Sequence, residues 1–83
     1  MKDRPANFVA VFNLPRNATS QELYKLFSTH GKIKNFNLRR DFFQAPAVFE
    51  VLYENETAAT AAKVNSDQLR FNGKNLYVRV NWF

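Results

Sequence analysis

The stretch that decides the fold covers residues 9–15, Val9-Ala10-Val11-Phe12-Asn13-Leu14-Pro15. Its apolar, β-branched composition predicts a strand, and the proline that follows ends that strand at a turn. Side chains alternate along a strand, so Val9 and Val11 share one face while Ala10 and Phe12 point to the other. One face must therefore build the core, and the other is either solvated or a binding surface.

Composition limits the protein to one small core. The chain has 83 residues, of which 46% are hydrophobic, and it contains no Cys, so burial rather than disulfides or thiolate-bound metal has to stabilise it. No apolar run approaches the roughly 20 residues that span a bilayer, and the polar first residues do not resemble a signal peptide. We therefore expect no membrane partner and an intracellular protein of the nucleus or the cytoplasm.

The charge balance points to a class of partner. Twelve Lys and Arg against seven Asp and Glu give a net charge of +5. A basic surface attracts polyanions, so nucleic acid is the first expectation, and an anionic membrane or an acidic protein comes after it.

Two helices are predicted downstream of the first strand. Thr19 and Glu22 have the spacing of a capping box and predict a helix over residues 20–29 that Gly31 ends. A second helix is predicted over residues 55–64, where small side chains would let it lie close against a sheet.

Three further strands follow from alternating hydrophobicity. They cover residues 33–40, 47–53 and 76–81. Phe36 and Leu38 should point inward, but Ile33 breaks their alternation, so an irregularity is expected near Lys34. Glu50 decides the orientation of its strand, because a carboxylate buried in so small a core would need a partner that the sequence does not identify. It should therefore point to the open face.

The elements form a strand-helix-strand unit that occurs twice. Right-handed connections of such units give an α+β, ferredoxin-like βαββαβ sandwich, with a four-stranded antiparallel sheet and two helices on one face. We expect residues 1–7 to be a flexible N-terminal lead and residues 8–83 to be a single domain, monomeric in isolation.

Three groups of residues together resemble a known family. They are residues 9–15, then Glu22-Leu23 through Leu26-Phe27 to Gly31, then Phe71-Asn72-Gly73 with Leu76 to Val80. With them, residues 8–81 resemble an RNA recognition motif. The resemblance implies the fold just described, with RNA on the face away from the helices, stacked on aromatic side chains of the two central strands.

The residues at the family's three stacking positions depart from its pattern. Ala10, Val48 and Glu50 stand where the family usually has aromatic side chains. Stacking is worth ~1–3 kcal/mol per base, and a carboxylate in mid-sheet repels phosphate. The usual mode of RNA binding is therefore not expected here.

Aromatic and basic residues elsewhere predict a displaced surface for single-stranded RNA. Arginines would contact phosphate, aromatic rings would stack on bases, and amides would contact base edges. The predicted site residues lie on the first strand, the basic second strand, its loop and the last strand: Phe12, Asn13, Asn37, Arg39, Arg40, Phe42, Phe43, Tyr77, Arg79, Asn81 and Trp82. Lys32 and Lys34 extend the basic cluster.

Several alternatives stay open. Asn13 could instead cap its turn, Phe42 or Phe43 could close the edge of the core, and the basic strand could be a solvated edge protected by its charges. The domain could also be a protein-interaction module that uses an apolar patch on the open face, or it could pack against a neighbouring repeat in a longer chain.

No enzymatic chemistry is predicted. A single His without Cys provides no metal site, and two Gly provide no glycine-rich phosphate loop. The sequence therefore predicts no catalytic residues, no metal and no cofactor.

Overall fold

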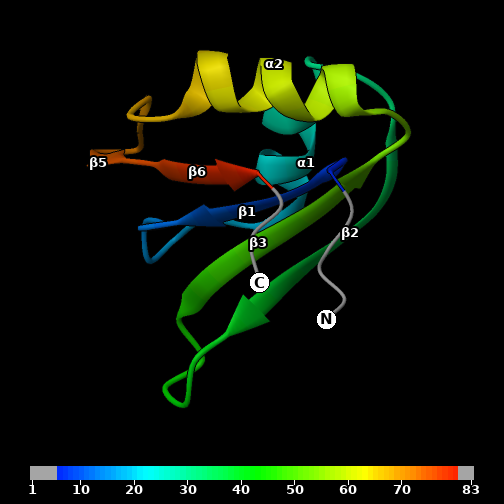
Figure 1. The fold of residues 1–83 in the computed structure, drawn as a ribbon. Coiled ribbons are helices and arrows are strands. Elements are labelled where there is room, and N and C mark those ends of the chain that lie inside the picture. The colour runs from blue at the N-terminus through cyan, green and yellow to red at the C-terminus, as the bar shows by residue number, and fades with distance from the viewer. Residues whose placement is uncertain (1–5, 81–83) are drawn as a thin grey trace.

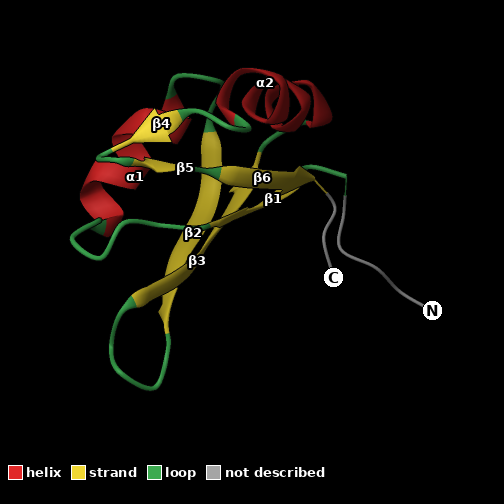
Figure 2. Cartoon of the chain, turned by 90° about the vertical axis from the view of Figure 1, so that its left-hand side faces the viewer, coloured by secondary structure: helices red, strands yellow, loops and turns green. Residues whose placement is uncertain are grey.

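A computed structural model describes residues 6–80. Its elements are β1 (Phe8–Phe12), α1 (Ser20–Ser28), β2 (Ile33–Arg40), β3 (Pro46–Tyr53), α2 (Glu56–Ser66), β4 (Arg70–Phe71), β5 (Lys74–Asn75) and β6 (Tyr77–Val80). Four strands form one antiparallel sheet in the order β2-β3-β1-β6, and β4 pairs with β5 in a small hairpin. Both helices lie on one side of the sheet (Figures 1 and 2). This is the predicted ferredoxin-like arrangement.

The start of α1 is set by a local hydrogen-bonded cap. The backbone N–H of Glu22 donates to Thr19 Oγ1 at 3.2 Å, and the N–H of Thr19 donates to Glu22 Oε1 at 3.2 Å. This is the predicted capping box. The helix ends one residue earlier than predicted, and it buries Leu23 and Phe27.

The second helix lies close to its neighbours because its inward residues are small. Asn55 caps it by accepting from the N–H of Ala58 at 2.9 Å, and Ala59 and Ala62 are fully buried. The helix continues two residues beyond its predicted end. A Cβ at Gly31 would collide with the Cβ of Ala58. Close contact with α2 therefore requires glycine at this position, in addition to its predicted role after α1.

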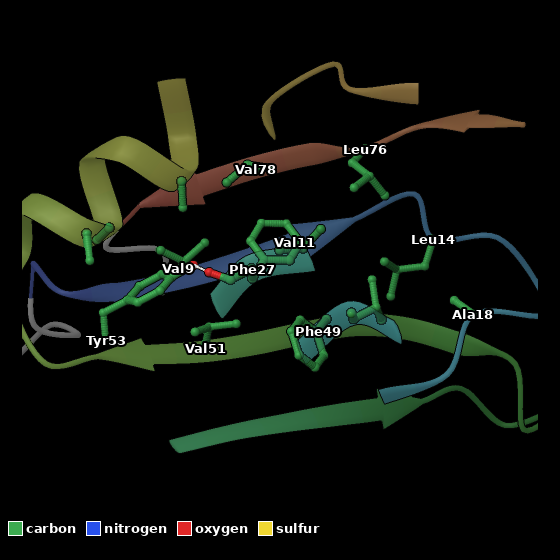
Figure 3. Close-up of a cluster of buried hydrophobic side chains, with 14 residues drawn as sticks. Val9, Val11, Leu14, Ala18, Phe27, Phe49, Val51, Tyr53, Leu76 and Val78 are labelled. Atoms are coloured by element: carbon green, nitrogen blue, oxygen red, sulfur yellow. Dashed lines mark hydrogen bonds between the residues drawn. The ribbon is translucent and has the colours of Figure 1, made fainter. Parts of the chain in front are cut away.

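The core lies between the helices and one face of the sheet (Figure 3). Its fully buried strand residues are Val9, Val11, Phe49, Val51, Tyr53 and Val78. These positions confirm the predicted alternation in both central strands. The Tyr53 hydroxyl donates to the carbonyl of Phe27 at 2.6 Å, which ties β3 to the end of α1. Burial raises the pKa of Tyr53.

The edge strand β2 is irregular where its sequence pattern breaks. The register with β3 shifts between Ile33 and Asn35, which confirms the irregularity predicted near Lys34, and it shifts again between Arg39 and Arg40. Phe36 lies on the helix side, as predicted, but it stays 41% exposed because its strand is at the edge. The ring of Tyr24 packs against it in a tilted arrangement, with centroids 4.9 Å apart and planes at 43°.

The ends of the domain differ from the sequence-based boundaries. The last strand begins at Tyr77, because Leu76 instead pairs with the segment after α2, its N–H donating to the carbonyl of Leu69 at 2.9 Å. Asn7 pairs with Tyr53 through two hydrogen bonds of 2.6 and 2.9 Å, so sheet pairing reaches into the predicted lead. Neither helix in residues 6–80 is long and apolar enough to cross a membrane.

Candidate nucleic-acid interface

The open face of the sheet, opposite the helices, carries side chains in transverse rows. The strand registers define two of them. The loop-side row, nearer the β2–β3 loop, consists of Arg39, Val48, Phe12 and Tyr77. The middle row consists of Asn37, Glu50, Ala10 and Arg79. Five of the predicted site residues therefore lie on one face: Phe12, Asn37, Arg39, Tyr77 and Arg79.

The middle row has a charged pair where the family stacks bases. Ala10 is fully buried and offers no ring. Glu50 points to the open face, as predicted, and its Oε2 lies 3.3 Å from the guanidinium of Arg39. The side chain of Glu50 is 14% exposed and that of Arg39 is 59% exposed. The sequence alone does not identify a partner for this carboxylate, and in the folded chain Arg39 of the neighbouring strand is that partner.

The β2–β3 loop displays two aromatic rings. Phe42 is 89% exposed and Phe43 is 80% exposed. Their rings meet edge to face, with centroids 5.2 Å apart and planes at 85°. The loop lies at the end of the β2–β3 hairpin farthest from the helices (Figures 1 and 2). The alternative, in which one of the rings closes the edge of the core, is therefore wrong.

Backbone hydrogen bonds define the shape of this loop. Asp41 Oδ1 accepts from the N–H of Phe43 at 2.8 Å and from the N–H of Ala45 at 3.0 Å. Gln44 adopts a positive φ of 66°, and its carbonyl accepts from the guanidinium of Arg40 at 3.0 Å. The two rings are thus presented by an ordered turn, which lowers the entropy cost of binding a partner.

The predicted arginines differ in their surroundings. Arg39 contacts Glu50, whereas Arg40, beyond the register shift that separates the two residues, donates to the loop carbonyl of Gln44. Arg79 turns toward the edge of the sheet, where its guanidinium lies 3.4 Å from Asp67 Oδ1. The pKa of Asp67 is lowered, first by the hydrogen bond from the N–H of Val78 and then by Lys63 and Arg79. Arg79 would have to leave this carboxylate to reach phosphate.

The asparagines of the predicted site also differ in their surroundings. Asn13 adopts a positive φ of 62°, and its Nδ2 donates to the carbonyl of Asn75 at 2.8 Å, which ties the end of β1 to β5. This contact supports the turn role that had been the alternative to base contact. Asn37 is exposed beside Glu50. Asn81 and Trp82 lie outside the described residues.

Sequence reasoning missed two residues that shape this surface. Asp67 holds Arg79 and caps the edge of β6, although it lies eleven residues before Val78 in the chain. The carbonyl of Asn75 accepts a hydrogen bond from the side chain of Asn13, which lies 62 residues earlier in the chain. No local signal identifies either contact, because both depend on the folded arrangement.

Comparisons with known proteins agree with this geometry. Residues 9–77 match the family model described as RNA recognition motif. Meiotic activator RIM4 of Saccharomyces cerevisiae is 36% identical over 72 residues, which cover 86% of this chain and 10% of that protein. Male determiner protein Nix of Aedes aegypti is 33% identical over 72 residues, which cover 86% of this chain and 25% of that protein. The chain thus spans a small part of each relative.

Solved structures give the same result. Pes4 RRM3 has a TM-score of 0.84 at 26% identity, covering 93% of both chains. The RRM3 domain of Hrb1 has a TM-score of 0.81 at 29% identity, covering 89% of this chain and 75% of that one. With the family match over most of its length, the chain belongs to the RNA recognition motif family, whose members generally bind RNA.

Proposed function

We propose that this domain binds single-stranded RNA on a displaced surface, formed by the loop-side row and by the Phe42–Phe43 pair at the loop tip. The observation that carries the proposal is the exposure of both rings, 89% and 80%, on a loop held by Asp41. A solvated aromatic pair beside Arg39 is unexplained by folding but is suited to stacking on bases.

Each part of the surface has a chemical task. Phe42, Phe43 and Tyr77, which is 42% exposed, offer rings for stacking, worth ~1–3 kcal/mol per base. Arg39 and Arg40, at the end of β2, offer charge for phosphates near the loop. These contacts would replace the stacking that Ala10 and Glu50 cannot provide, and they predict binding of modest affinity that falls steeply with salt.

Four further residues belong to the proposed surface, and two of them, Asn81 and Trp82, rest on the sequence alone. Asn81 and Trp82 would extend the surface beyond β6, Phe12 would lie in it between Val48 and Tyr77, and Arg79 would contribute once it is released from Asp67. We also propose that residues 8–83 act as one monomeric domain behind a short lead, inside the cell.

Removing the aromatic pair tests the proposal. Binding of a fluorescent pool of short single-stranded RNA is measured by anisotropy, and the double variant Phe42→Ala/Phe43→Ala is expected to bind ~10–100-fold more weakly. Amide chemical shifts of Arg39, Phe43 and Tyr77 should move when RNA is added to the unmodified protein. The matched control is Val64→Ala, which truncates a 73% exposed residue on α2 and should change nothing. A folded double variant that binds normally would refute the proposed surface.

A protein-interaction module is the second candidate. It is favoured by aliphatic side chains on the open face, since Val48 and Leu52 are only partly buried and lie on the same face as Tyr77. Such an apolar patch rimmed by charge suits a peptide or helix. Unmoved amide shifts with RNA at low salt would favour this candidate over the first.

A further inference from the structure

The charged pair in the middle of the open face has hydrogen-bonding capacity that the fold leaves unused. Glu50 lies between Asn37 and Ala10 in the middle row. Within residues 6–80 its carboxylate has one hydrogen-bond partner, Arg39, through Oε2 at 3.3 Å. A carboxylate offers about four acceptor sites and a guanidinium five donors, and the side chains of Glu50 and Arg39 are 14% and 59% exposed, so both groups keep hydrogen-bonding capacity for a ligand.

The order of these groups matches one base. Side by side, Arg39 and Glu50 present a donor followed by two acceptor oxygens. The Watson–Crick edge of guanine presents the complement: the acceptor O6, the donor N1–H and a donor on N2. Adenine and cytosine pair an amino donor with a ring-nitrogen acceptor, and uracil has one donor between two carbonyls. Each of these three bases can give Glu50 one donor while Arg39 reaches an adjacent acceptor, whereas guanine gives Glu50 two donors.

We infer that Arg39 and Glu50 select guanine within the RNA bound at the proposed surface, so the inference rests on the proposed function. Arg39 would donate to O6, and Glu50 would accept from N1–H and from N2. Hydrogen bonds to charged groups are the stronger ones. The base would present its edge to this pair, in contrast with the stacked arrangement that the missing aromatics would have provided.

Recognition of guanine would also explain why Glu50, an acidic residue, lies on a face that binds RNA. A carboxylate here repels phosphate and would weaken binding of any strand unless it makes a contact of its own. Its position beside Arg39 keeps the local charge near neutral while offering two acceptors. Base recognition is thus a use of Glu50 that an apolar residue could not replace.

The test compares oligouridine RNAs whose central nucleotide is uridine, guanosine, inosine, adenosine or cytidine. Inosine keeps O6 and N1–H but lacks the N2 amino group. The guanosine RNA is expected to bind at least about fivefold tighter than each of the others. In Glu50→Gln, whose amide replaces one acceptor by a donor, the preference should fall below about twofold while the uridine RNA binds as well or better.

The matched control is Glu54→Gln, which removes the same charge from an exposed residue just after β3. It should keep the full preference for guanosine. Equal binding of all five RNAs by the unmodified protein would overturn the inference and leave the proposed function standing. A guanosine preference that survives in Glu50→Gln would also overturn it. If no RNA binds, the proposed function is overturned together with the inference.

Discussion

At the scale of single residues, the buried hydroxyl of Tyr53 is a contact between the sheet and α1 that stability measurements can isolate. It donates to the carbonyl of Phe27 at 2.6 Å in a fully buried setting. Tyr53→Phe removes this donor without changing the ring, so the free energy of unfolding in urea should fall by about 1 kcal/mol. RNA affinity should not change, because the side chain points away from the open face.

The control is Tyr77→Phe, which removes the hydroxyl of a 42% exposed ring. Its free energy of unfolding should stay within about 0.5 kcal/mol of the original. Equal stability of Tyr53→Phe and the unmodified protein would mean that the hydrogen bond to Phe27 contributes nothing net.

Glu50 shows how far residue-level reasoning extends. Its outward orientation follows from the cost of burying a carboxylate, and the register Ala10–Glu50 confirms it. Its salt-bridge partner Arg39 cannot be predicted from the sequence, because the β2–β3 register depends on the bulge at Lys34. Continued without that bulge, the register that starts at Ile33 and Tyr53 would place Phe36 opposite Glu50, whereas the bulged strand places Asn37 there. The broken alternation predicted the bulge, but the salt bridge required coordinates.

At the scale of elements, the β2–β3 loop combines order with exposure. Asp41 Oδ1 accepts from two backbone N–H groups, and removing that acceptor should let the loop sample other conformations. Asp41→Ala should therefore lower RNA affinity several-fold through the entropy of reordering. The free energy of unfolding should change by less than about 0.5 kcal/mol, because the loop lies outside the core. Amide order parameters of residues 41–45 should fall in parallel.

Asp41→Asn separates the hydrogen bonds from the charge. Its side-chain oxygen can still accept from Phe43 and Ala45, so loop order and RNA affinity should return to the original values. If Asp41→Asn behaves like Asp41→Ala, charge rather than loop order would explain the loss.

Elements set by local signals were predictable, and those set by distant contacts were not. The capping box at Thr19 and the Asn55 cap depend on residues within one turn of each helix, so their positions could be predicted. The β4–β5 hairpin was predicted only as a turn at Asn72-Gly73, because two-residue strands carry no alternation. The sequence does not decide whether Phe42 and Phe43 are exposed, since a loop sequence does not say whether its rings reach the core.

At the scale of the whole molecule, the positive charge is spread rather than gathered in one cluster. Lys34 and Arg39 lie at opposite ends of β2, about 16 Å apart at ~3.3 Å per residue. Arg79 is paired with Asp67, and Arg39 with Glu50. The net charge of +5 could be predicted from composition, but its division between paired and solvated groups could not. Arg39 and Arg40 end the strand that leads into the Phe42–Phe43 loop, so in an RNA without guanine they are the cations best placed for phosphate.

The salt dependence of RNA affinity tests whether Arg39 and Arg40 contact phosphate. On single strands each phosphate contact contributes about −0.7 to the slope of log K against log salt, so Arg39→Ala/Arg40→Ala should make the slope shallower by about 1.4. Lys25→Ala, an exposed cation on α1, should leave the slope unchanged because the helices lie on the opposite side of the sheet. Affinities for oligouridine RNA at several salt concentrations give both slopes. An unchanged slope with weaker binding in the double variant would show that the arginines contact bases or shape the loop, whereas a shallower slope in Lys25→Ala would place RNA on the helical side.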